Sequence, residues 1–178
     1  MDEIKNESVE TNASDKEFLK VENLKKYFVI EKSLFGKPLR YLKAVDDVSF
    51  TLERGKTIGV VGESGCGKTT LGRTILKLYE PDGGKIFFEG QELTHLKKKK
   101  MRRFRTDMQL VFQDPYSSLS PRLRVGEIIG EAVAEHGIVS KEQLKDYVLD
   151  VMQKCGLQPH YYERYPHEFS GGQRQRIC

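Results

Sequence analysis

The sequence predicts a mixed α/β fold, and three observations support this. Short runs rich in β-branched and aromatic residues predict strands at 18–28, 44–52, 56–61, 85–89 and 108–112. A helical pattern at 68–78 lies between two of these strands. From Val125 onward the pattern is helical throughout. Strands that alternate with helices are typical of an α/β layer architecture.

Length and composition favour a globular, cytosolic protein. The chain has 178 residues, enough for one domain or for one domain with a subdomain. No apolar stretch approaches the roughly 20 residues that span a bilayer. Residues 1–16 are polar and acidic, so they predict a disordered tail and not a signal peptide. The three cysteines are an odd number without metal-ligand spacing, which predicts free thiols.

The first half is expected to be strand-rich, and the second half helical. Residues 31–40 contain glycine and proline and predict a loop between the first two strands. The helix at 68–78 places Leu71, Ile75 and Leu78 on one face. Residues 113–124 predict a second loop. Two helices follow, one at 126–136 and one that begins at a Ser140–Gln143 capping box and ends before Gly156.

Positive charge is concentrated in one run, Lys97-Lys98-Lys99-Lys100-Met101-Arg102-Arg103, in a chain of net charge +4. Such a run is compatible with a nucleic-acid or anionic-lipid patch, and also with an ordinary solvated helix face. No cluster of aromatic residues surrounds it to stack on bases. We therefore favour the solvated face and expect no nucleic-acid partner.

One segment carries the clearest chemistry: Gly62-Glu63-Ser64-Gly65-Cys66-Gly67-Lys68-Thr69-Thr70. It fits the phosphate-loop pattern G-x-x-x-x-G-K-S/T, between a predicted strand and a predicted helix. The glycines allow the backbone N–H groups to surround a phosphate, and the helix N-terminus adds its positive dipole end. Lys68 is expected to reach the β- and γ-phosphates, and the Thr69 hydroxyl to ligate Mg²⁺. Cys66 is interpreted as a small filler in this loop.

Two later segments indicate which class of phosphate-loop protein this is. Gln113 follows the predicted strand 108–112, where its amide can reach a bound metal or a water near the γ-phosphate. Pro115 next to it suits a hinge, although a polar loop residue without a role is the alternative. Ser170-Gly171-Gly172-Gln173 predicts a capped helix start whose uncovered N–H groups form a second anion site. An ordinary glycine-containing helix start is the alternative there.

Together these segments resemble the ATP-binding subunits of ABC transporters. Residues 62–69 resemble their Walker A motif, Gln113 their Q-loop glutamine, and Ser170-Gly171-Gly172-Gln173 their signature motif, although Phe169 stands where the family more often has leucine. Residues 111–122 and 164–177 further resemble the oligopeptide and dipeptide importer branch, as does the long loop at 31–40. Nickel and glutathione importers share these features, so the solute stays open.

The resemblance implies a P-loop NTPase core with an N-terminal antiparallel β subdomain and a helical subdomain. The core is expected over 17–113, the helical subdomain over 114–169, and the start of the signature helix over 170–178. ATP and Mg²⁺ are the implied cofactors, with Thr69 and Gln113 near the metal. An aromatic residue near the first strand stacks on adenine in this family. Phe28 matches best, and Tyr27 and Tyr41 are alternatives.

The resemblance also implies partners. Two ATP-binding subunits, identical or paralogous, pair head to tail, and each ATP lies between the phosphate loop of one and the signature of the other. Residues 116–169 are expected to contact transmembrane permease subunits, so the protein is peripheral at the cytoplasmic face of the membrane. A non-transport ABC ATPase, a small-molecule kinase or GTPase, and a non-catalytic remnant are the alternatives.

The family's Walker B strand and switch histidine follow the signature motif, and residues 1–178 contain neither. We therefore expect a domain that is incomplete at its C-terminus, a fragment or a truncated product. By itself it is expected to be poorly stable and to hydrolyse ATP negligibly.

Overall fold

The computed structural model describes residues 17–33, 35–112, 114 and 119–178. The predicted tail at 1–16 and Gln113 lie outside the described residues. The chain divides into two compact units, one up to Met108 and the other from Gln109 to Cys178, and each is described by itself. Within the described ranges, no helix has the length and apolar character needed to cross a membrane.

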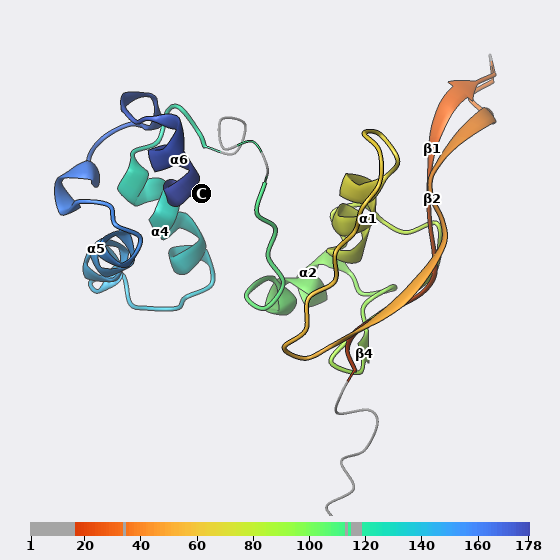
Figure 1. The fold of residues 1–178 in the computed structure, drawn as a ribbon, viewed down its shortest axis with the longest axis horizontal. Coiled ribbons are helices and arrows are strands. Elements are labelled where there is room, and N and C mark those ends of the chain that lie inside the picture. The colour runs from red at the N-terminus through yellow and green to blue at the C-terminus, as the bar shows by residue number, and fades with distance from the viewer. Residues whose placement is uncertain (1–16, 34, 113, 115–118) are drawn as a thin grey trace, which may run out of the picture. The chain divides into compact units, whose positions relative to one another are not determined.

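The first unit is built on a four-stranded antiparallel sheet (Figure 1). Its strands are β1 (Glu17–Lys32), β2 (Pro38–Glu53), β3 (Gly83–Phe88) and β4 (Gln91–Glu92), in the order β2-β1-β3-β4. The predicted strands at 18–28, 44–52 and 85–89 are therefore confirmed, and so is the α/β class.

The predicted loop at 31–40 is wrong in its bounds. β1 and β2 extend into this range from both sides as a long hairpin, β1 to Lys32 and β2 from Pro38 (Figure 1). Val29 lies opposite Tyr41, and Glu31 opposite Arg40. Cross-strand hydrogen bonds supply partners that the Gly/Pro composition does not reveal. β3 pairs with β1 only as far as the Lys25–Gly83 pair, so the distal hairpin has no third strand among the described residues.

The core of this unit lies between the sheet, the helix α1 (Lys68–Ile75) and the buried residues Met101 and Phe104. Leu24, Ile86 and Leu93 are fully buried, and Leu71 of α1 joins the same cluster. Phe88 packs edge-on against two other rings, those of Phe18 and Phe104. This packing places α1 against β1 and β2.

α1 ends three residues earlier than predicted, and the predicted core residue Leu78 is 49% exposed. The cause is a Schellman motif at its end. The Leu78 N–H donates to the Arg73 carbonyl at 2.8 Å and the Lys77 N–H to the Thr74 carbonyl at 2.9 Å. Lys77 occupies the left-handed position, with φ of 54°, where glycine is usual.

The strands predicted at 56–61 and 108–112 are not formed. Residues 56–61 are all exposed, Val61 to 93%, and Val111 is 81% exposed. A strand exists only where a neighbour completes its hydrogen bonds. Within the described ranges neither segment pairs with β1, β2, β3 or β4. Both segments have the apolar composition of strands, but no strand of this sheet pairs with them.

The lysine run forms α2 (Lys98–Met101) and the 3₁₀ turn η2 (Arg102–Arg105). Met101 and Phe104 are buried, one helical turn apart, whereas Lys98, Lys99 and Lys100 are exposed. The arrangement is that of a short amphipathic segment with its cations in solvent.

The second unit is helical, as predicted. It contains α4 (Val125–Glu135), α5 (Leu144–Lys154) and α6 (Gly171–Ile177), with 3₁₀ turns η3 (Pro159–Tyr161) and η4 (Pro166–Glu168). Its core is apolar and draws on all three helices: Leu119, Val125, Val148, Met152, Leu157, Phe169 and Ile177.

The capping box predicted at Ser140 is only half formed. The Ser140 N–H donates to the Gln143 side chain at 3.4 Å, but the intervening residues form a turn, and α5 begins at Leu144. The predicted end before Gly156 is confirmed, because Gly156 has φ of 69°.

The difference in burial between Ile86 and Ile58 predicts different losses of stability when each is replaced by alanine. Ile86 is fully buried and Ile58 is 40% exposed. Ile86→Ala should lower the free energy of unfolding by about 3 kcal/mol, and Ile58→Ala by less than about 1 kcal/mol. Urea denaturation of both variants checks this, and equal losses would contradict the exposed state of residues 56–61.

Candidate functional site

The phosphate-loop motif lies between the exposed segment 56–61 and α1. Gly65 and Gly67 have φ of 83° and 101°, in the region that favours glycine. A Cβ added to Gly67 would lie 2.1 Å from the Ala44 carbonyl oxygen of β2. Only glycine therefore lets the end of the loop lie against β2. At Gly67 the loop therefore packs directly against the backbone of β2.

The Lys68 side chain folds back over its own loop. Its Nζ donates to the carbonyl oxygens of Gly62 and Glu63, both at 2.7 Å, and lies 3.5 Å from the Cys66 Sγ. The ammonium group is thus held at the loop, on the side of the first motif glycine. Two neutral carbonyls leave its charge uncompensated, and the α1 N-terminus adds to the positive potential. The arrangement suits a polyanion.

The first turn of α1 presents hydroxyl groups next to this charge. Thr69 is exposed, whereas Leu71 and Thr74 on the following turn are buried. Thr74 donates its hydroxyl to the Thr70 carbonyl at 2.7 Å. In a metal–nucleotide complex a hydroxyl oxygen can ligate the metal, while an ammonium group and a helix N-terminus bind the phosphates. The residues present therefore fit bound Mg²⁺ with a nucleotide.

Phe28 lies on β1 and is half-buried. Its ring packs edge-on against Tyr79, with centroids 5.5 Å apart, and the Lys26 Nζ lies 5.5 Å from the ring centroid. The two alternatives differ from it. The Tyr27 hydroxyl donates to Asp46, a bond that raises the pKa of Tyr27 and lowers that of Asp46. Tyr41 is 51% exposed. Adenine stacking by Phe28 stays a prediction.

The capping box at the signature segment is confirmed. Ser170 is the N-cap of α6, and its Oγ accepts from the Gln173 N–H at 3.3 Å. The Gln173 side chain accepts from the Ser170 N–H at 3.0 Å. Phe169 is buried in the helical core, so the helix start is anchored from the residue before it. A Cβ on Gly172 would meet nothing within 4 Å, which leaves this turn uncovered.

The predicted site residues divide between the two units. Residues 62–70 and Phe28 belong to the first unit, and Ser170–Gln173 to the second. The structure thus brings together the phosphate loop, Lys68 and Thr69. The Ala44 carbonyl was not predicted as part of this site. It acts through its backbone, so no residue type signals it.

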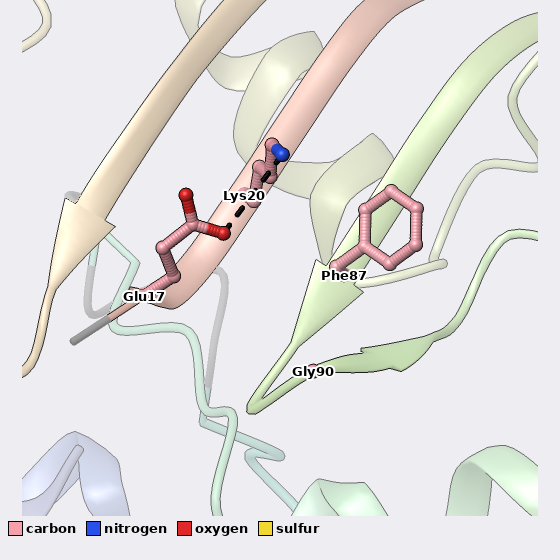
Figure 2. A pocket seen from close by; sticks show the side chains of 4 residues that line it. All are labelled: Glu17, Lys20, Phe87 and Gly90. Carbon is pink, nitrogen blue, oxygen red and sulfur yellow. Dashed lines mark ion pairs between the residues drawn. The ribbon is translucent and has the colours of Figure 1, made fainter. Parts of the chain in front are cut away.

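A hollow beside the N-terminal end of β1 contains none of the predicted site residues. Glu17, Lys20, Phe87 and Gly90 line it (Figure 2). The Lys20 ammonium pairs with Glu17 at 3.8 Å and with Glu22 at 3.1 Å, which raises the pKa of Lys20. The charges are satisfied locally, and the hollow has no chemistry comparable to that of the loop. Across the described segments, no three metal-ligating side chains of the His, Cys, Asp or Glu type cluster.

The glycine loop seated on β2, the folded-back lysine and the following helix define a phosphate-binding protein of the P-loop class. A comparison with protein families makes the class specific. The family model described as "ABC transporter" matches residues 45–178, and the chain belongs to this family.

Curated relatives extend the match. The chain is 46% identical over 168 residues to the oligopeptide transport ATP-binding protein AppF of Bacillus subtilis, covering 94% of this chain and 51% of that protein. It is 49% identical over 156 residues to the dipeptide transport ATP-binding protein DppF of Escherichia coli, covering 88% and 46%. The chain thus spans about half the length of the curated relatives that it matches.

Solved structures agree on the fold. A dimeric ATP-binding cassette in a post-hydrolysis state, bound to ADP and Pi, superimposes with a TM-score of 0.75. The match covers 89% of this chain and 66% of that one, at 23% identity. A cassette of a cbiONQ transporter complex from Clostridium perfringens gives a TM-score of 0.67, also at 23% identity, over 91% and 59%.

The seating of the loop predicts different effects for two glycines. Gly67→Ala should lower the melting temperature by several degrees, because a Cβ cannot occupy the space beside the Ala44 carbonyl. Gly72→Ala, within α1 and with nothing near its Cβ, is the control. It should be neutral or stabilise by up to about 1 kcal/mol. Thermal melts of both variants decide, and a harmless Gly67→Ala would disprove the close approach.

The capped start of α6 gives a second prediction. Ser170→Ala removes the acceptor for the Gln173 N–H and should destabilise the helical unit by about 1 kcal/mol. Ser170→Asp, which keeps an acceptor at the cap, should retain most of the stability. Hydrogen exchange of the α6 amides measures both, and identical protection in the two variants would argue against the cap.

Proposed function

We propose that this chain is the ATP-binding part of a subunit that powers an ABC importer for peptides. The observation that carries the proposal is the Lys68 ammonium group held over a glycine loop that is seated on β2. The names of the relatives, oligopeptide and dipeptide transport ATP-binding proteins, support the solute class.

In this proposal the bound nucleotide replaces internal contacts of the loop. The Gly62 and Glu63 carbonyls that now accept from Lys68 lose it to the β- and γ-phosphate oxygens. The loop N–H groups and the α1 N-terminus supply further positive potential. Thr69, with Gln113, would hold Mg²⁺, which when bound neutralises phosphate charge. The other loop residues, Glu63, Ser64, Gly65, Cys66 and Thr70, supply backbone around the phosphates.

The second anion site completes the composite pocket of a dimer. Ser170-Gly171-Gly172-Gln173 would face the γ-phosphate of the ATP held by a second ATP-binding subunit, identical or paralogous. Its capping box fixes the start of the helix, and the exposed Gly172 has no side chain to cover the backbone there, which suits that role. Binding then closes the dimer, and hydrolysis opens it.

The remaining assignments follow from this role. The nucleotide-binding core would comprise residues 17–113, the helical subdomain 114–169, and the signature helix begin at 170. The helical subdomain would contact the transmembrane permease subunits, which keeps the protein peripheral at the cytoplasmic face.

Ligand-induced stabilisation tests the nucleotide site. With Mg-ATP at 100 times its Kd, the free energy of unfolding should rise by about 2.7 kcal/mol. Lys68→Ala should abolish this rise, because it removes the charge held at the loop. Lys99→Ala removes an exposed lysine of the same unit and should leave the rise intact. A thermal-shift titration reports all three, and no stabilisation of the wild-type chain would contradict ATP binding.

A further inference from the structure

The C-terminal end of α1 is held by a cation from the turn that follows the lysine run. Arg105 donates from Nη1 to the Leu76 carbonyl at 2.6 Å, and its Nη2 lies 3.5 Å from the Lys77 carbonyl. Carbonyls at a helix end carry the negative end of the dipole and need donors from outside the helix. The guanidinium group, half-buried on η2, supplies such a donor to the C-cap residue Leu76 and also approaches the carbonyl of Lys77, the residue after the cap.

A second contact ties the same end to the sheet. The buried Lys77 side chain donates to the Thr94 carbonyl and pairs with Glu80. The Thr94 hydroxyl in turn accepts from the Ile86 N–H of β3 at 2.9 Å. The end of α1 is therefore bonded both to η2 and, through Thr94, to the centre of the sheet.

The length of α1 makes its end important for its start. The helix has eight residues, so it is about 12 Å long. A tilt of roughly 5° about the C-terminal end moves the N-terminal end by about 1 Å. That end carries Gly67 and Lys68, and displacements of about 1 Å at a reacting group can change rates about a hundredfold. A remote anchor can therefore govern the geometry of the loop.

We propose that Arg105 is a positioning residue for the phosphate loop: through the Leu76 and Lys77 carbonyls it sets the orientation of α1 and thereby the place of Lys68. The inference rests on the proposed function, since its consequence is a change in nucleotide affinity. Arg103 offers a matched control on the same turn. Its guanidinium group donates to the Gln91 side chain and lies over the Phe104 ring, 4.6 Å from the centroid. Neither of these contacts involves the end of α1.

The experiment measures the Kd for a fluorescent ATP analogue with Mg²⁺, using the whole chain and variants that circular dichroism shows to be folded. Arg105→Gln should weaken binding about tenfold, the size of effect expected when charge-assisted hydrogen bonds are lost. Arg105→Lys, which keeps the charge and one donor, should weaken it only about threefold. Arg103→Gln, with the same loss of charge, should bind within about twofold of wild type.

The outcomes separate this inference from the proposed function. If the wild-type chain does not bind the analogue, or if Lys68→Ala binds as well as wild type, the proposed function fails and the inference fails with it. If wild type binds but Arg105→Gln binds equally well, only the inference is overturned. Equal losses in Arg105→Gln and Arg103→Gln also overturn it, because net charge would then explain both.

A purely structural role for Arg105 predicts a lower melting temperature without the graded affinity series. If Arg105→Gln does not fold, Arg105→Lys is compared with Arg103→Lys. Threefold weaker binding in the former alone supports the inference, and equal affinities overturn it.

Discussion

The contact between Gly67 and the Ala44 carbonyl is the constraint on which the candidate site depends. It holds the end of the loop against β2, and α1 starts at the next residue, so this contact fixes the point at which the helix begins. Lys68 then reaches back to Gly62 and Glu63 because the loop closes on itself at this point. The conformation of the phosphate loop, residues 62–70, therefore depends on one backbone atom of β2, the Ala44 carbonyl oxygen.

Much of this site could be predicted from the sequence, for a physical reason. Residues 62–70 and 170–173 form local structures, a glycine loop before a helix and a capped helix start, and neighbours in sequence supply their hydrogen bonds. The same holds for the end of α5 at Gly156. Motifs of this kind can be recognised without knowing what packs around them.

Predictions that depended on distant partners were less successful. Residues 56–61 and 108–112 have strand composition but do not pair with the described sheet. Residues 31–40 have loop composition, yet both ends of this range belong to the β1–β2 hairpin. α1 ends earlier than predicted because Lys77 adopts a backbone conformation typical of glycine. The contacts of its buried side chain with Thr94 and Glu80 compensate for the strain. Pairing and burial of this kind are properties of the fold and cannot be read from a window of sequence.

The exposed state of residues 56–61 and 109–112 has a consequence for the behaviour of this chain in concentrated solution. Both segments contain exposed apolar residues, and the side chains of Val61 and Val111 are 93% and 81% exposed. Such segments template intermolecular β-pairing. Aggregation of this chain at high protein concentration is therefore expected to depend on these two segments.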